Sequence, residues 1–320
     1  MIWGDKAMNI EDTKNITILG AGVMGNTFAQ VFAGHGYDVR LWSRTHRTLD
    51  RALGRIRSTL QMLVEFGRLS GDEIPSIMSR ISPTTDLSKA AKGAQFVLET
   101  VSEVPDIKRE LFSELNNLCS KDTVLASNTS GLDIFNIARV DNPSRLIITH
   151  WFSPAHIIPL VEIVAGEETS QEVVTFTWML MERLGKKPIL LKKFVPAFIV
   201  NRVQNAINKA VFEMIDNRWA TPQDIDLAIK YTHGIRLPIV GVAQVLDFNG
   251  LDLIRDINER LEIKSAFIEE KVKQGRLGAK TGTGIYDYGG RSEAEILKKR
   301  DELYFKMLDH LKKINAFEPV

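Results

Sequence analysis

The apolar residues in the first part of the chain fall into short runs separated by amphipathic stretches. Runs rich in β-branched residues are typical of strands, and they occur at 16–19, 38–42, 96–100, 123–127, 145–149 and 159–164. Between several of these runs, apolar residues recur at the spacings of three and four typical of helices, at 23–34, 45–68, 105–118 and 171–184. This alternation predicts an α/β fold with a Rossmann-like, mostly parallel sheet that carries helices on both faces.

The pattern changes near residue 193. From Val195 onward helical spacing dominates, as at 253–261 and 294–311, and strand signals are few. Thr221-Pro222, with Asp224 two positions on, is a typical helix start. We therefore predict a dinucleotide-binding domain over 1–193, in which 1–13 form a tail, and an all-α domain over 194–320.

Composition and charge narrow the class of protein. The 320 residues carry 41 basic and 40 acidic side chains, a net charge of +1, which lacks the basic excess of a nucleic-acid binder. The hydrophobic fraction of 44% is too high for a disordered chain. The single cysteine, Cys119, cannot form an intrachain disulfide, and no apolar run reaches the roughly 18 residues of a membrane span. We expect a cytoplasmic protein with no nucleic-acid or membrane partner, and no motif predicts a metal site.

A glycine motif follows the first predicted strand directly. The segment reads Gly20-Ala21-Gly22-Val23-Met24-Gly25 and runs into a helical pattern. In this G-x-G-x-x-G arrangement the first glycine allows a tight turn, the second lets a pyrophosphate approach the backbone, and the third lets the helix pack against the strand. The helix N-terminus supplies N–H groups for the phosphates. Although an ordinary glycine-rich turn is the competing interpretation, the strand–turn–helix context favours a dinucleotide site with contacts from Gly20, Gly22, Val23, Met24 and Gly25.

The end of the second predicted strand bears on the choice of cofactor. A carboxylate there would bond the ribose hydroxyls of NAD, but this chain has Ser43, Arg44 and Arg47 instead. Guanidinium groups bind a 2′-phosphate through charge-assisted hydrogen bonds. The sequence therefore favours NADP(H) over NAD(H). Alternatively, both arginines are solvated residues at a helix start and NAD is still used.

Four further segments, taken with the glycine motif, form a recognisable set. They are Ser127-Asn128-Thr129-Ser130, His150-Trp151-Phe152-Ser153-Pro154, Pro159-Leu160-Val161-Glu162 and Phe198-Ile199-Val200-Asn201-Arg202. With these segments the chain resembles the 3-hydroxyacyl-CoA dehydrogenase family, which includes relatives that act on free hydroxy acids such as gulonate and carnitine. The resemblance covers about residues 14–290 and includes the segment that begins Lys280-Thr281-Gly282.

The chemistry of such an enzyme explains these residue types. Oxidation of a secondary alcohol needs a base for the hydroxyl proton while hydride passes to a nicotinamide, and histidine is poised near neutral pH. The resemblance implies that His150 is the acid/base, that Glu162 is its partner, and that Ser130 and Asn201 hold the substrate oxygen. His156 lies only six residues from His150, and position alone does not separate the two.

The resemblance also implies cofactor contacts and an assembly. The matching cofactor-side residues are Glu103, Lys108, Asn128, Ser153 and Lys280, although the family commonly has asparagine where this chain has Ser153. The resemblance further implies that the all-α domain binds the substrate and forms the contact of a homodimer. Arg236 and Asp247 are further candidates for the substrate end.

Departures from the family pattern leave the substrate open. Ala197 stands where the family commonly has glycine. The segment 60–66 has no basic residue, although family members that bind coenzyme A are expected to have a lysine near Phe66. We expect a 3-hydroxyacyl-CoA dehydrogenase type of reaction, with a free small 3-hydroxy acid as the alternative substrate. A nucleotide-binding structural protein on the same fold is the alternative from another class.

Overall fold

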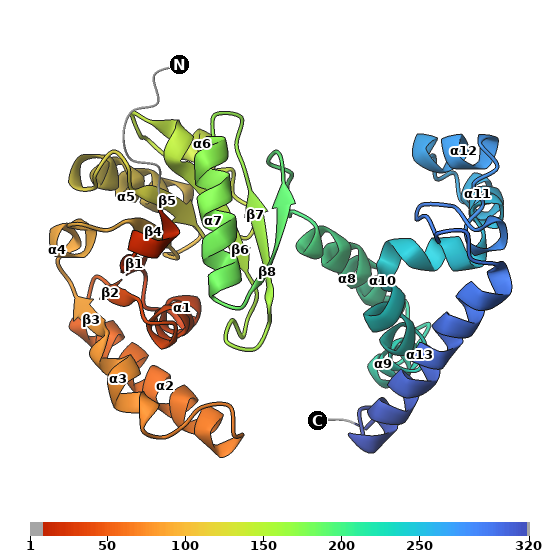
Figure 1. The fold of residues 1–320 in the computed structure, drawn as a ribbon, viewed down its shortest axis with the longest axis horizontal. Helices are drawn as coiled ribbons and strands as arrows, with labels where there is room; N and C mark the ends of the chain where they lie inside the picture. Colours follow the sequence, from red (N-terminus) through yellow and green to blue (C-terminus); the bar gives the residue numbers. More distant parts are fainter. Residues whose placement is uncertain (1–8, 319–320) are drawn as a thin grey trace. The chain divides into compact units, whose positions relative to one another are not determined.

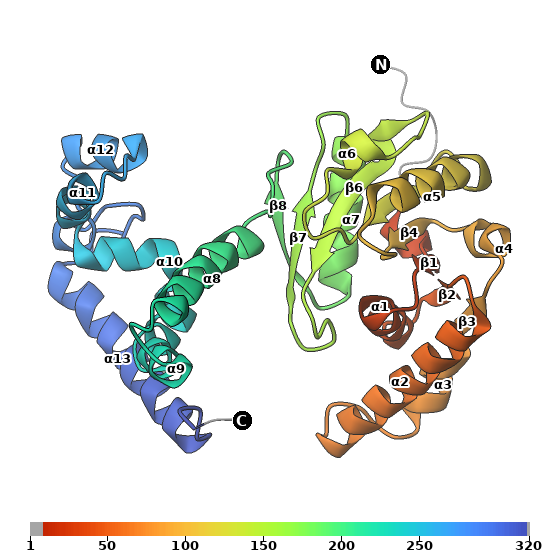
Figure 2. The ribbon, with the colours of Figure 1, turned by 180° about the vertical axis from the view of Figure 1, so that it is seen from behind.

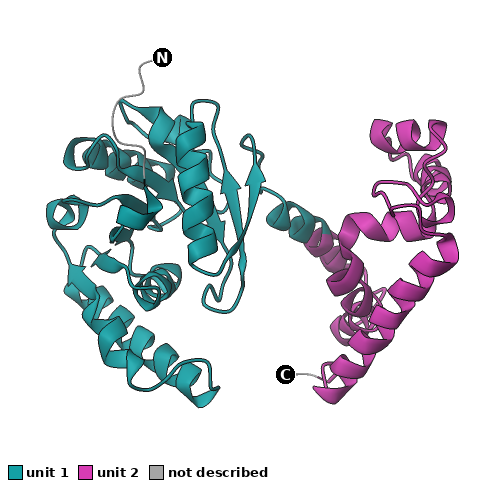
Figure 3. Ribbon diagram, in the orientation of Figure 1, with its two compact units in different colours: residues 1–206 teal, residues 207–320 magenta. Residues whose placement is uncertain are grey.

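The computed structural model describes residues 9–318 and divides the chain into two compact units (Figure 3). The first unit ends at Ala206 and the second begins at Ile207, both within one helix, α8 (Val200–Asp216). The sequence predicts the change of domain earlier, between 193 and 194. The N–H groups of Ile199, just before α8, and of Val200, its first residue, bond Glu162 of the sheet, so the start of α8 is tied to the first unit.

One eight-stranded sheet organises the first unit (Figures 1 and 2). Its strand order is β3-β2-β1-β4-β5-β6-β7-β8, and every neighbouring pair is parallel except β6 with β7. This arrangement confirms the predicted Rossmann-like, mostly parallel sheet. The strands are β1 Asn15–Leu19, β2 Asp38–Trp42, β3 Ile81–Thr84, β4 Phe96–Glu99, β5 Val124–Ser127, β6 Leu146–Trp151, β7 Leu160–Val164 and β8 Lys187–Leu191.

Helices cover both faces of this sheet, as the alternation of patterns predicts. Buried residues of α1, α2 and α7 pack with one face, and those of α4, α5 and α6 with the other. On the first face the rings of Phe28 and Phe32 lie tilted against Trp151, with their centroids 5.1 and 6.1 Å from that of the Trp151 ring. The helices are η1 Ile10–Asp12, α1 Val23–Gly34, α2 His46–Glu65, α3 Glu73–Ser79, α4 Leu87–Ala91, α5 Pro105–Leu118, α6 Ile134–Ile137, η2 Pro143–Arg145 and α7 Gln171–Arg183.

The two edge strands, β3 and β8, escape prediction from the sequence. Each contains a proline, Pro83 or Pro188, which cannot donate a backbone hydrogen bond and is tolerated at a sheet edge. Two of the four β3 residues are exposed, which weakens the apolar signal further. These strands extend the predicted sheet at its two ends without changing its order.

The described part of the second unit is helical, with two isolated β-bridges beside η3. Thr221 caps α9 by accepting a hydrogen bond from the backbone of Asp224, as the sequence predicts. Within the described residues no single helix is long and apolar enough to cross a membrane; α10 and α11, bent by 85°, pass that test only as a pair. The helices after α8 are α9 Pro222–Lys230, α10 His233–Asn249, α11 Leu251–Arg260, α12 Ala266–Lys273, η3 Ala279–Thr281 and α13 Glu293–Lys313.

Candidate active site

The glycine loop joins β1 to α1, and its three glycines meet different surroundings. Gly20 has a φ of +107°, and a Cβ there would lie 2.5 Å from the carbonyl oxygen of Thr100. A Cβ on Gly25 would lie 1.7 Å from the carbonyl oxygen of Gly20, so the helix can approach the strand only with glycine. At Gly22, the N-cap of α1, a Cβ would meet no atom within 4 Å, and no side chain caps the helix. The protein itself thus leaves the backbone at Gly22 open, as a bound pyrophosphate requires.

The end of β2 presents cations rather than a carboxylate. Ser43 is buried, and its N–H donates to the carbonyl oxygen of Thr84. Arg44 and Arg47 are exposed, and neither forms an ion pair with a described residue. Thr45 caps α2 between them. Both guanidinium groups are therefore available to an anion at this end of the sheet.

His150 and Glu162 form a buried pair across the two antiparallel strands. They are direct cross-strand partners of β6 and β7, so both side chains project from the same face of the sheet. The His150 Nδ1–H donates to Glu162 Oε2 at 2.7 Å, which leaves Nε2 as the nitrogen that can exchange a proton. The rings of Phe152 and Phe198 lie beside the imidazole, with centroids 4.6 and 5.3 Å away.

The second oxygen of Glu162 is held by the start of α8. Its Oε1 accepts the N–H groups of Ile199 and Val200 at 2.9 and 3.0 Å. Burial raises the pKa of the Glu162 carboxyl, but hydrogen bonds from His150, Val200 and Ile199 outweigh burial and leave the pKa below its usual range. A carboxylate anchored in this way fixes the tautomer of His150 and can stabilise an imidazolium.

Asn201 and Ser130, both predicted to hold the substrate oxygen, are brought together. Asn201 lies in the first turn of α8, and its Nδ2 donates to the carbonyl oxygen of Ser130 at 3.3 Å. The N–H of Ser130 donates to Glu103 Oε1 at 2.9 Å, and its hydroxyl lies 3.4 Å from the same oxygen. Ser130 is exposed and Asn201 is partly buried. The donors best placed to reach a ligand are the Ser130 hydroxyl, whose contact with Glu103 is long, and the second N–H of the Asn201 amide.

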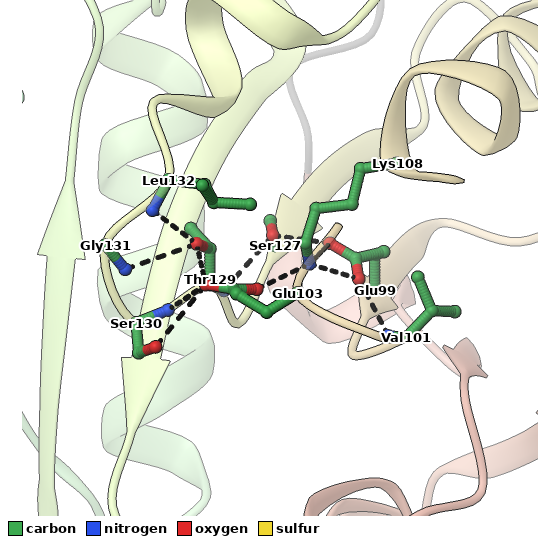
Figure 4. A network of polar contacts seen from close by, with 9 residues as sticks. All are labelled: Glu99, Val101, Glu103, Lys108, Ser127, Thr129, Ser130, Gly131 and Leu132. Atoms are coloured by element: carbon green, nitrogen blue, oxygen red, sulfur yellow. Dashed lines mark hydrogen bonds and ion pairs between the residues drawn. The ribbon is translucent and has the colours of Figure 1, made fainter. Parts of the chain in front are cut away.

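A network of polar contacts continues from Ser130 into the protein (Figure 4). Glu103 accepts the hydroxyl of Thr129 at 2.5 Å and the ammonium of Lys108 at 3.1 Å. Lys108 also bonds both oxygens of Glu99, at 2.7 and 2.8 Å, and the hydroxyl of Ser127 donates to Glu99 at 2.5 Å. Burial raises the pKa of Glu103, but the hydrogen bond from Thr129 and the charge of Lys108 lower it more, so its pKa lies below the usual range.

Lys108, predicted from the resemblance as a cofactor contact, is buried in the protein. Its side chain is 1% exposed, and its ammonium is fully engaged with the carboxylates of Glu99 and Glu103. Sequence reasoning missed Glu99, which is completely buried at the end of β4. The available signal was a glutamate that ends an otherwise apolar strand run and precedes a lysine by nine residues. In this structure Lys108 joins the buried Glu99 to Glu103, and Glu103 in turn holds Ser130.

The remaining predicted cofactor residues occupy three separate positions. Asn128 follows β5, and its Oδ1 accepts the N–H of Trp151 at 2.9 Å, which ties the end of β5 to β6. Ser153 is exposed just after β6. Lys280 lies in η3 of the second unit and forms an ion pair with Asp252. The structure therefore leaves the proposed contacts of Ser153 and Lys280 with the cofactor as predictions.

Other residues that the sequence raises as candidates have structural roles. Asp247 is buried, and its carboxylate accepts the N–H groups of Ile285 and Tyr286 and the hydroxyl of Tyr288; a place for it at the substrate end stays a prediction. Both ring nitrogens of His156 are buried without a partner among the described residues, so it has no orienting carboxylate.

Burial raises the pKa of the Cys119 thiol to about 11, so it stays protonated at neutral pH. Residues 9–318 contain no cluster of three His, Cys, Asp or Glu suited to a metal ion.

Comparison with known proteins decides which family carries this arrangement. Residues 15–194 match the family model described as the NAD binding domain of 3-hydroxyacyl-CoA dehydrogenase, and residues 198–288 match the model of its C-terminal domain. The chain belongs to the 3-hydroxyacyl-CoA dehydrogenase family. It is therefore an oxidoreductase with a nicotinamide cofactor, as the glycine loop and the four segments predict.

Relatives within the 3-hydroxyacyl-CoA dehydrogenase family align over most of the chain. A probable 3-hydroxybutyryl-CoA dehydrogenase of Bacillus subtilis is 34% identical, over 87% of this chain and 98% of that protein. The 5-formyl-3-hydroxy-2-methylpyridine 4-carboxylate 5-dehydrogenase of Mesorhizobium japonicum is 30% identical, over 86% and 91%. The crystal structure of a 3-hydroxyacyl-CoA dehydrogenase of Archaeoglobus fulgidus superimposes with a TM-score of 0.77 at 29% identity, over 93% of this chain and 99% of that one.

Proposed function

We propose that the protein interconverts a 3-hydroxy and a 3-keto group of an acyl-CoA or a related acid, with His150 as the acid/base. The observation that carries this proposal is the buried contact between His150 and Glu162, because it presents Nε2 as the one ring nitrogen free to exchange a proton. During oxidation Nε2 accepts the hydroxyl proton as the carbon gives up hydride. A bound nicotinamide supplies the chemistry that accepts this hydride.

The roles of the other polar residues follow from their positions. The resulting imidazolium is stabilised by Glu162, which stays ionised because its pKa is low. Ser130 and Asn201 donate hydrogen bonds to the substrate oxygen, and in the reduction of a ketone these donors stabilise the developing negative charge. In the reduction, protonated His150 donates its Nε2 proton to the substrate oxygen, which reverses the proton transfer of the oxidation.

The test of this function is a panel of substrates followed by nicotinamide absorbance. It compares acetoacetyl-CoA and longer 3-ketoacyl-CoA thioesters with free 3-keto acids and 3-dehydrocarnitine. We expect at least one 3-keto compound to be reduced. The absence of turnover with every member would contradict the proposal and support a nucleotide-binding structural protein on this fold.

A free small 3-hydroxy acid is the second candidate substrate, and the C-terminal end of α2 favours it. The segment 60–66 has no basic residue to meet the phosphates of coenzyme A, and Phe66 is 72% exposed there. The relative from Mesorhizobium japonicum is named for a small pyridine carboxylate. A higher kcat/KM for a free acid than for its CoA thioester would select this candidate.

We propose that NADP(H) is preferred over NAD(H), on the basis of the cationic end of β2. NADPH is expected to bind at least about tenfold more tightly than NADH, because a 2′-phosphate gains paired hydrogen bonds from Arg44 and Arg47. Arg44→Ala is expected to remove most of this difference while leaving NADH affinity near that of the parent. Equilibrium titration of each dinucleotide, monitored by nicotinamide fluorescence, measures both affinities.

A matched control is available on the same helix. Arg57→Ala removes an exposed guanidinium ten residues after Arg47, about 15 Å further along α2, and is expected to leave both affinities unchanged. Equal affinities for NADH and NADPH in the parent, or an Arg44→Ala variant with unchanged NADPH affinity, would show that the arginines are solvated and that NAD is used.

We also propose a homodimer formed through α8. No residue of α8 is buried, although Val203, Ile207 and Phe212 are apolar and at least 39% exposed. Such a face is typical of a subunit contact. Sedimentation equilibrium is expected to give the mass of two chains for the parent and of one chain for Ile207→Glu, and a monomeric parent would contradict the proposal. The cytoplasmic location and the absence of nucleic-acid and membrane partners stay predictions from the sequence.

A further inference from the structure

The turn that precedes α8 contains two consecutive residues in a left-handed conformation. Ala197 has a φ of +64° and Phe198 a φ of +50°, and neither is glycine. Side chains with a Cβ disfavour this region, so the surrounding structure must hold the turn in place. Packing of Phe198 stabilises the turn. Its side chain is 1% exposed, and its ring centroid lies 5.9 Å from that of Phe194 and 5.3 Å from that of His150.

The left-handed turn has a direct effect on Glu162. It ends immediately before Ile199 and Val200, whose two successive N–H groups converge on Glu162 Oε1. Convergence of successive N–H groups on one anion is the usual result when the backbone changes hand. Glu162 is therefore clamped between the imidazole of His150 on one oxygen and the start of α8 on the other.

The same turn fixes two other parts of the site. Asn201 follows Val200 in the first turn of α8, and its amide reaches the carbonyl oxygen of Ser130. The ring of Phe198 lies beside the imidazole of His150. The side-chain partner of Glu162 is His150, and its two backbone partners are Ile199 and Val200 at the end of the turn.

We propose that the Ala197–Phe198 turn is a positioning element that holds Glu162 against Nδ1 of His150 and so keeps the imidazole in one tautomer. This inference rests on the proposed role of His150 as the acid/base. The turn acts through Glu162 rather than by contact with substrate or cofactor. Its effect should therefore appear in kcat and in the state of the imidazole rather than in dinucleotide affinity.

The test compares two substitutions of Ala197. Ala197→Val places a β-branched side chain in the left-handed region, whereas Ala197→Gly permits that conformation freely. Ala197→Val is expected to lower kcat at least about tenfold with dinucleotide affinity within about twofold of the parent, because small displacements of reacting groups are costly in rate. Ala197→Gly should keep at least about half of the parent kcat. Ala294→Val, on the exposed surface of α13, is the matched control and should behave as the parent.

A second readout does not depend on turnover. Nitrogen NMR of the protein labelled with ¹⁵N-histidine distinguishes the two imidazole tautomers, and His150→Ala assigns the signals. The parent and Ala197→Gly should show His150 protonated at Nδ1, and Ala197→Val should show a mixture of tautomers. If Ala197→Val does not fold, Phe198→Leu removes the ring that supports the turn and should produce the same mixture.

The outcomes separate this proposal from the proposed function. A single Nδ1 tautomer in both Ala197→Val and Phe198→Leu overturns the positioning role, whether or not the enzyme is active. Equal losses of kcat in Ala197→Gly and Ala197→Val also overturn it, because the loss would then not depend on the left-handed conformation. A parent without turnover that nevertheless shows the tautomer change in Ala197→Val contradicts the function and leaves the positioning role supported.

Discussion

His150→Ala is expected to lower kcat by about 10²- to 10⁴-fold, the usual contribution of a general acid/base. The physical reason is that Nε2 of His150, the ring nitrogen not bound to Glu162, is the proposed acceptor of the hydroxyl proton, and alanine removes it. Dinucleotide binding should persist, since the glycine loop and the end of β2 are unchanged. Steady-state kinetics with the best substrate of the panel and titration with NADPH measure the two effects separately.

Two further variants test whether the loss of kcat is specific to His150 and its carboxylate partner. Glu162→Gln keeps the shape of the side chain but not its charge, so an intermediate loss of kcat is expected, because the imidazolium is then unpaired. His156→Ala is the matched control: the residue lies in the segment after β6, but its ring has no orienting partner, and kcat should stay near that of the parent. A His156→Ala variant as slow as His150→Ala, or a His150→Ala variant with full activity, would reject the assignment.

Lys108→Met is expected to cause the largest loss of stability, about 3–5 kcal/mol in the free energy of unfolding. Methionine matches the length of lysine but leaves the fully buried carboxylate of Glu99 without its counter-charge. For a protein of this size such a loss lowers Tm by roughly 10 °C. Thermal and urea unfolding followed by circular dichroism measure the effect on the purified protein without any substrate.

The control for Lys108→Met is an exposed ion pair. Lys89 lies 3.9 Å from Asp86 with its side chain 78% exposed, and Lys89→Met should cost at most about 1 kcal/mol. The double variant Lys108→Met/Glu99→Gln should recover part of the lost stability, because it removes the unpaired charge. If Lys108→Met unfolds at the same temperature as Lys89→Met, then the buried network does not stabilise the sheet.

The sequence predicted most of the fold because most strands and helices carry a periodic signal. The glycine loop and the strands from β4 to β7 were located to within a few residues, whereas β3 and β8 were missed because each is short and contains a proline. The partnership of His150 and Glu162 followed from a family resemblance. Its geometry depends on the antiparallel register of β6 and β7, which no local pattern encodes.

The environment of Lys108 was the part least accessible from the sequence. A lysine near the start of a helix is normally solvated, and only contacts across β4, β5 and α5 show that this one is enclosed. The left-handed turn at Ala197 was also hard to foresee, because alanine by itself gives no sign of a positive φ, and only the glycine that the family commonly has at this position points to one. In both cases the deciding interactions join residues that are close in space and specified by tertiary packing rather than by local preference.

The register of β6 and β7 has a consequence for how long the protein keeps its active site on storage or heating. Because His150 and Glu162 are paired within the interior of a continuous sheet, their amide protons belong to the part of a protein that opens last. Fraying of termini leaves this backbone pairing in place. Loss of the pairing on storage or heating therefore requires disruption of the sheet itself, and its lifetime is set by the unfolding rate of the first unit.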